Sequence, residues 1–283
     1  MNMLNSDLKK AALNKLKEVS ERYASLGKKV NEDAVNLLTE RKKASTLIKL
    51  IEDYINLLVN TPKDFEKKVK EIKINIDKFS AILEIEYDEK RANKIVGGIS
   101  GAGVLAGAGV AAFGPTAAMA IATTFGTAST GTAISALSGA AATNAALAWL
   151  GGGALTAGGG GMAAGSALLG LAGPLGWAIG GSALIGGAVL ANKKNKKIAV
   201  KAQQETIEIE KQIAILQGVR TEISQLIQLT NEHVHGIHKQ YYSLSQTAPS
   251  DYRLFTDEQK LEIGALVNNT LSLSKLINKQ VGK

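Results

Sequence analysis

The chain has 283 residues, no cysteine and a formal net charge of +8. The length allows one large domain or two ordinary ones, and the lack of cysteine excludes disulfides, thiolate nucleophiles and cysteine-ligated metals. The excess of basic residues permits an anionic partner, such as a nucleic acid or an acidic lipid surface.

Charge divides the chain into three blocks. Residues 1–94 carry 20 basic and 16 acidic side chains, and residues 193–283 carry 13 and 9. The 98 residues between them, 95–192, contain no Asp, Glu, Lys, Arg or His. We therefore expect an N-terminal helical segment (1–94), an uncharged Gly/Ala-rich segment (95–192) and a C-terminal segment with a long helix and a final helix (193–283).

Apolar residues in the N-terminal flank recur at steps of four and three, which predicts amphipathic helices with a narrow apolar seam. Asn60-Thr61-Pro62 predicts a break between helices. The three series are Leu8, Ala12, Leu16, Val19, Tyr23, Leu26 and Val30; Leu47, Ile51, Tyr54 and Leu58; and Phe65, Val69, Ile72, Ile76, Phe79 and Leu83.

The uncharged segment is several times longer than the roughly 20 residues that cross a bilayer as a helix. Residues 95–113 and 175–191 are its clearest candidate spans. Cations at both ends of the segment favour a cytoplasmic location for both flanks, and hence two or four crossings. The residues expected at the membrane interface are Arg91, Lys94, Trp149, Trp177, Lys193, Lys194, Lys196 and Lys197.

Residues 116–138 are rich in hydroxyl groups, which suit contact with other helices or a water-filled lumen better than contact with lipid. If this part lines a pore, nine side chains are expected to face the lumen: Thr116, Thr123, Thr124, Thr127, Ser129, Thr130, Thr132, Ser135 and Ser138.

Glycine gives the uncharged segment a second property, because small residues allow helices in lipid to approach closely. Spacings of four predict helix packing at Gly97/Gly101, Gly103/Gly107, Gly161/Gly165 and Gly176/Gly180. Gly and Ala also bury little apolar area, so insertion gains little free energy. We therefore expect two states, one folded in water around the segment and one inserted, with GGGALTAGGGG (residues 151–161) as the hinge or turn that lets the adjoining helices rearrange.

In the C-terminal flank, apolar or neutral residues fall seven apart and predict one long helix over residues 197–245. Thr256 and Gln259 form the sequence pattern of a capping box that starts a last helix ending near Val281. The heptad positions are Ile209, Leu216, Ile223, Thr230 and Ile237, with Val219 and Leu226 between them. Together the flanks predict an all-α fold, an elongated bundle of about five amphipathic, coiled-coil-like helices around the hydrophobic segment.

The candidate catalytic and cofactor motifs in this chain are incomplete. A G-x-G-x-x-A pattern at residues 101–106 lacks the acidic residue that a dinucleotide site needs about 20 positions later, and no P-loop occurs. His233, His235 and His238 converge poorly as metal ligands from one straight helix, although a pH-sensing role stays open. We expect no catalytic residue, cofactor or metal.

Two short basic runs, Arg41-Lys42-Lys43 and Lys193–Lys197, could contact a polyanion. Few aromatic residues are present for base stacking, so a nucleic acid is not expected as a partner. The second run lies beside an apolar span and fits anionic lipid better.

The order of blocks resembles that of α-helical pore-forming proteins. These include the hemolysin E-like toxins, whose long helical bundle packs a hydrophobic element, and more loosely the colicin pore domains and apolipoprotein L. The resemblance lies in architecture over the whole chain, with seamed helices at 1–94 and 197–281 around 95–192, and no diagnostic motif carries it. The chain departs from the toxins in its longer apolar block and in its N-terminus, which has no apolar core of a cleaved secretory signal.

The resemblance implies a non-enzymatic protein that oligomerises and permeabilises a bilayer, and the departures favour an intracellular effector, such as one that depolarises the cell's own membrane. We expect it to be made in the cytoplasm, to be soluble before insertion, and to bind an anionic membrane, other copies of itself and, if required, a partner protein. Two alternatives stay open: a permanent membrane anchor or adaptor with cytoplasmic coiled-coil flanks, and a soluble helical scaffold with a glycine-rich core.

Overall fold

The computed structural model describes residues 2–83, 124 and 191–281. The ranges 2–83 and 191–281 form four α-helices and one 3-10 turn, and they contain no β-strand beyond an isolated bridge between Val59 and Asp251. The all-α class is thus confirmed for the described residues. The elements are α1 (Asn2–Leu57), α2 (Lys63–Leu83), α9 (Ala191–Thr247), η5 (Tyr252–Leu254) and α10 (Asp257–Leu276).

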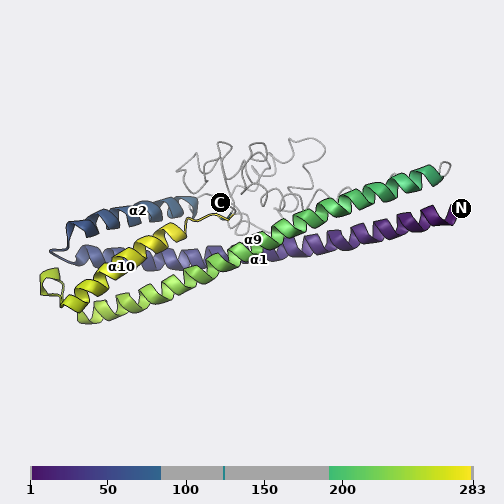
Figure 1. The fold of residues 1–283 in the computed structure, drawn as a ribbon. Helices are drawn as coiled ribbons and strands as arrows, with labels where there is room; N and C mark the ends of the chain where they lie inside the picture. Colours follow the sequence, from purple (N-terminus) through teal and green to yellow (C-terminus); the bar gives the residue numbers. More distant parts are fainter. Residues whose placement is uncertain (1, 84–123, 125–190, 282–283) are drawn as a thin grey trace.

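Helices α1 and α9 lie side by side and run in the same direction (Figure 1). They have 56 and 57 residues, which corresponds to about 85 Å each at the rise of an α-helix. Arg220 Nε donates to Asp33 Oδ2 at 2.7 Å, and the rings of Tyr54 and Tyr241 meet edge to face with centroids 5.5 Å apart. Both pairs are separated by 187 positions in the sequence, so the two helices keep one register along this length.

The heptad seam predicted for α9 is buried along its whole length. Thr230 is its polar member, and the Thr230 hydroxyl donates to the Leu226 carbonyl at 2.7 Å, which satisfies the only side-chain polar group of the seam internally. Residues seven apart can stay on one face only if the helix packs like a coiled coil. The buried positions are Ile209, Leu216, Val219, Ile223, Leu226, Thr230 and Ile237.

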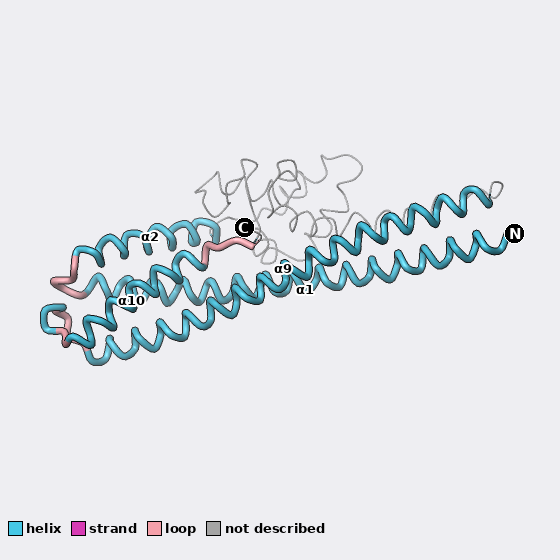
Figure 2. Tube along the Cα trace, in the orientation of Figure 1, coloured by secondary structure: helices cyan, strands magenta, loops and turns pink. Residues whose placement is uncertain are grey.

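Helices α2 and α10 return antiparallel to the long pair and cover only one end of it (Figures 1 and 2). They lie parallel to each other (Figure 1), and they contact each other where Glu71 forms an ion pair with Lys275 at 2.8 Å and Asn75 Nδ2 donates to Ser274 Oγ at 3.0 Å. One end of the protein therefore has four packed helices. The N-terminal parts of α1 and α9 extend beyond α2 and α10 (Figure 1), and we call residues 2–30 and 191–217 of these helices the arm.

The two interhelix connections of the four-helix end pair with each other. Helix α1 ends at Leu57, and Asn60 takes a positive φ of 60°, a conformation that asparagine tolerates better than most residues. The Val59 amide donates to the Ser250 carbonyl at 2.9 Å, and the Tyr252 amide donates to the Val59 carbonyl at 3.0 Å. The predicted break before Pro62 is confirmed, as is the capping box, in which Thr256 and Gln259 bond each other reciprocally. The predicted end of the last helix near Val281 is wrong, because α10 ends at Leu276 and the following residues bond instead to α2 and α1.

Three further details of the sequence analysis are wrong. The first two apolar series, which were treated separately as ending at Val30 and starting at Leu47, belong to one continuous helix, because the seam continues through Ala34, Leu37 and Ala44, all fully buried. Residues 2–83 and 191–281 therefore contain four α-helices, where about five were expected for the flanks. Leu8 is 43% exposed and lies outside the seam, because the buried positions begin at Ala12.

The third error concerns Arg41, which the sequence analysis assigned to a basic surface run. Arg41 is 1% exposed and is the largest fully buried side chain of the described residues. It occupies a seam position, four residues after Leu37 and three before Ala44, and a seam position points inward whatever its side chain.

Membrane-crossing helices were also sought in the structure. None of the described helices combines the length and the apolar character needed to span a bilayer. The candidate span at 95–113 lies outside the described residues, and so does the one at 175–191 except for its last residue, Ala191, where α9 begins.

Candidate functional site

The uncharged segment meets the packed helices at Thr124. This residue is helical and fully buried, and its backbone carbonyl accepts a hydrogen bond from the Val281 amide at 3.0 Å. The Thr124 hydroxyl is buried and has no hydrogen-bond partner among the described residues. One residue of the segment that was predicted to line a lumen is therefore packed against the C-terminal end of the protein.

The other residues predicted for the segment and its N-terminal entrance lie outside the described residues. The structure neither brings them together nor separates them. They are Gly97, Gly101, Gly103, Gly107, Gly161, Gly165, Gly176, Gly180, Thr116, Thr123, Thr127, Ser129, Thr130, Thr132, Ser135, Ser138, Arg91, Lys94, Trp149 and Trp177.

Residues 277–281, which we call the tail, connect Thr124 to three helices. Ile277 and Val281 are buried, so the tail packs as part of the core. Asn278 Nδ2 donates to the carbonyls of Asn75 on α2 and Ser274 on α10, each at 3.0 Å. The tail is thus held to α2 and α10 by a side chain and to the uncharged segment by its backbone.

Arg41 attaches the tail to α1. Its Nη2 donates to the carbonyl of Lys279, which lies in the tail beyond the end of α10. Burial lowers the pKa of Arg41 to about 10, so the guanidinium stays charged at neutral pH. Among the described residues no carboxylate pairs with it, and its Nε has no hydrogen-bond partner.

The sequence analysis missed the role of Arg41 and the tail, although a signal was present. Arg41 interrupts an apolar series with heptad spacing, and a charged residue at such a position is either exposed by a helix break or buried with a partner. The partner is a backbone carbonyl near the C-terminus, which no periodicity in the sequence can reveal.

The lysine run predicted at the exit of the uncharged segment forms the first turns of α9. Lys193, Lys194, Lys196 and Lys197 follow directly after Ala191 and Asn192, and Lys196 and Lys197 are exposed. Cations at a helix N-terminus oppose the helix dipole, and no acidic residue occurs in the first turn of α9 to offset them. The run therefore lowers the stability of the helix.

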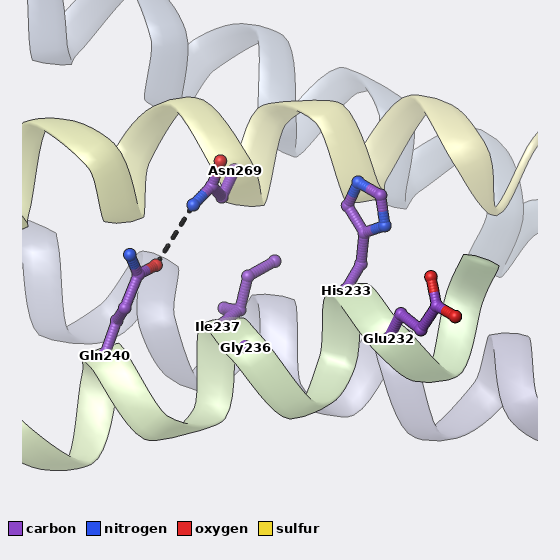
Figure 3. A pocket seen from close by; sticks show the side chains of 6 residues that line it. All are labelled: Glu232, His233, Gly236, Ile237, Gln240 and Asn269. Atoms are coloured by element: carbon purple, nitrogen blue, oxygen red, sulfur yellow. Dashed lines mark hydrogen bonds between the residues drawn. The ribbon is translucent and has the colours of Figure 1, made fainter. Parts of the chain in front are cut away.

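A hollow of about 330 Å³ lies between α9 and α10 (Figure 3). Asn269 Nδ2 bridges its rim to Gln240 Oε1 at 3.1 Å, and Gly236 leaves space, since a Cβ placed there would meet no atom within 4 Å. No charged groups converge in it from both helices, so the hollow is a polar packing gap. Its lining residues are Glu232, His233, Gly236, Ile237, Gln240 and Asn269.

The histidines of α9 remain separate in the structure. His235 and His238 are exposed, while His233 Nδ1 lies 2.9 Å from the Leu229 carbonyl of its own helix. The described residues contain no group of three or more His, Asp or Glu side chains arranged to hold a metal ion. The site with the most specific contacts is therefore the tail, with Arg41 and Thr124.

Comparison with known proteins adds no relative to this description. No protein-family model, curated protein sequence or solved structure matches the chain.

Proposed function

We propose that this protein is a non-enzymatic, α-helical membrane-permeabilising protein whose uncharged segment, residues 95–192, inserts into a lipid bilayer. The observation that carries the proposal is the run of 98 residues without an ionisable side chain, placed between two strongly charged helical flanks. A run of this length is far longer than one core helix of a soluble protein needs and is sufficient for several membrane crossings.

A stored form in water is supported by the contact between Thr124 and the tail. Thr124 belongs to the uncharged run, yet it is fully buried and hydrogen-bonded to Val281. A segment poor in large apolar side chains is only marginally stable in lipid, so packing against protein competes with insertion. In this proposal the helices α1, α2, α9 and α10 hold the stored form, and insertion replaces contacts such as this one.

Permeabilisation requires several copies. Helices rich in Gly and Ala pack closely and leave little space within one chain, whereas a ring of copies can enclose water. The hydroxyl-rich part of the segment, residues 116–138, faces that water in the proposed assembly, and the lysines at the start of α9 remain at the membrane surface.

Dye release from liposomes tests the proposal. Leu105 lies in the first candidate span, and Leu105→Lys places a charge there at a cost of about 3 kcal/mol in a bilayer centre, while Leu105→Met keeps the apolar character. We expect the wild type and Leu105→Met to release dye from anionic vesicles and Leu105→Lys to release far less. Equal release by all three, or none by the wild type over a wide range of pH and lipid composition, would contradict the proposal.

A permanent membrane adaptor is the second candidate, and one surface favours it. Leu57, Val59 and Leu254 are 75%, 52% and 70% exposed on the two connections at the four-helix end, and exposed aliphatic groups in proximity often mark a protein interface. Cell fractionation separates the two candidates. Protein found only in membranes, without dye release and with a partner bound through these three residues, supports the adaptor.

A further inference from the structure

The free end of the arm concentrates the positive charge of the chain. In residues 2–17 of α1 and 191–204 of α9, which we call the tip, there are nine lysines and one acidic residue, Asp7. This set accounts for the whole formal net charge of +8, because the other 24 basic residues of the chain are matched by 24 acidic residues.

The parallel direction of the two helices creates this cluster. With the offset of 187 seen at Asp33/Arg220 and Tyr54/Tyr241, Lys9 and Lys10 lie level with Lys196 and Lys197. Figure 1 likewise shows both helices starting at the same end of the molecule. An antiparallel pair would have placed the two lysine groups at opposite ends of helices about 85 Å long.

Ion pairs within the helices neutralise only part of the tip. Lys15 pairs with Glu18 at 3.3 Å and Lys17 with Glu21 at 3.9 Å. Lys10, Lys196 and Lys197 are exposed, and no ion pair of theirs occurs among the described residues. Both helices also begin here, so the positive ends of two helix dipoles add to the field.

We propose that the tip is a docking surface for an anionic lipid bilayer, so that the protein meets the membrane end-on, arm first. This inference rests on the proposed function, for which it supplies the first contact. Basic residues beside an anionic leaflet each contribute attraction that adds over a cluster. Exposed Leu8 and Val200 lie among the lysines, with 43% and 42% of their surface accessible, and aliphatic groups beside lysines suit the headgroup region.

Two features favour lipid over a nucleic acid as the partner. The tip contains no Phe, Tyr or Trp, so it lacks the side chains on which bases stack. The uncharged segment ends at Asn192, and the run of four lysines within residues 193–197 begins with the next residue. Docking of the tip on a bilayer therefore brings one end of the proposed insertion segment to the membrane surface.

Vesicle flotation with two matched variants tests the docking surface. The tip variant carries Lys9→Gln, Lys10→Gln, Lys196→Gln and Lys197→Gln. The control variant carries Lys63→Gln, Lys67→Gln, Lys70→Gln and Lys78→Gln, all exposed positions of α2. Both variants lose four positive charges, so they differ only in where the charge is removed. Circular dichroism checks that each remains helical with an unchanged melting temperature.

The wild type and control variant should bind vesicles containing about one-third phosphatidylserine, with binding weakened by salt, and should bind pure phosphatidylcholine poorly. The tip variant should lose on the order of 100-fold in partitioning, and the control less than about 3-fold. Equal losses in both variants would show that net charge alone matters and would overturn the inference, as would no loss in either.

Two further readouts separate this inference from the proposed function. Binding of the wild type to duplex DNA through the tip lysines, without binding to phosphatidylserine vesicles, would assign the tip to a nucleic acid and overturn the inference. Dye release is recorded on the same vesicles. Tip-dependent flotation without release supports docking and contradicts permeabilisation, whereas release that the tip variant retains in full contradicts docking alone.

Discussion

Arg41 Nη2 donates a hydrogen bond to the carbonyl of Lys279, a residue 238 positions away in the sequence. The bond joins the middle of α1 to the tail that also contacts Asn75 and Thr124. A charged side chain 1% exposed, without a carboxylate partner among the described residues, costs more to desolvate than a single hydrogen bond returns. Arg41 thus connects the tail to α1 at the expense of stability.

This balance predicts opposite outcomes for two substitutions of Arg41. Arg41→Met fills a similar volume without a buried charge, so the free energy of unfolding should equal or exceed that of the wild type. Arg41→Ala leaves a cavity and should lower it by about 2–4 kcal/mol. Urea unfolding followed by circular dichroism measures both, and Arg22→Met, at an exposed position of α1, serves as the control. A loss above about 2 kcal/mol in Arg41→Met would show that the Lys279 bond outweighs desolvation.

The burial of Tyr23 leads us to predict that the protein loses stability at alkaline pH, when this side chain ionises. Burial in the arm, where Tyr23 is 1% exposed, raises its pKa to about 12. The folded protein keeps a phenol proton that the unfolded chain loses near pH 10, so the stability contributed by neutral Tyr23 is present below about pH 10 and is lost as pH rises towards 12.

Absorbance of tyrosinate during an alkaline titration measures this effect. Tyr23→Phe should remove a late-titrating tyrosine, and Tyr242→Phe, at a position 63% exposed, serves as the matched control. If Tyr23→Phe removes an early step instead, the Tyr23 side chain is open to solvent in solution and the arm is not packed as described.

The parallel register of α1 and α9 predicts which engineered cysteines can be joined. The chain has no native cysteine, so Asp33→Cys with Arg220→Cys gives a clean pair at positions whose native side chains are 2.7 Å apart. A short bismaleimide should link this pair within one chain. Asp33→Cys with Gln203→Cys should not react, since position 203 is displaced by 17 residues, about 25 Å along the helix. Efficient linking of the second pair alone would disprove the register.

The capping box at the start of α10 predicts a local stability effect. The Thr256 hydroxyl accepts a hydrogen bond from the backbone N–H of Gln259 at 3.2 Å, and the side-chain Oε1 of Gln259 accepts one from the backbone N–H of Thr256 at 3.0 Å. Thr256→Ala should lower the free energy of unfolding by about 1 kcal/mol. Thr221→Ala, at an exposed interior position of α9, should raise it slightly because alanine favours helix interiors. Equal effects in thermal melts would show that the cap contributes nothing.

Local features of the sequence determined the helices of the flanks. The heptad positions from Ile209 to Ile237 are buried, Pro62 follows a break, and Thr256 with Gln259 starts a helix. Each of these depends on residues within one or two turns, where backbone geometry and hydrogen bonding are decided locally. The long uncharged run is likewise a property of the sequence, and the proposed function depends on it.

The relative direction of α1 and α9, and the contacts between residues far apart in the sequence, were decided only by the tertiary structure. An apolar seam on α1 can pack against α9 in either direction, since periodicity defines a face and carries no polarity. Residues 84–190 between α2 and α9 are too long a connection to impose one direction. The parallel arrangement brings Lys9 and Lys10 beside the lysines of α9, and the path of the tail buries Arg41. Both results depend on contacts between residues about 190 to 240 positions apart, which local sequence patterns do not encode.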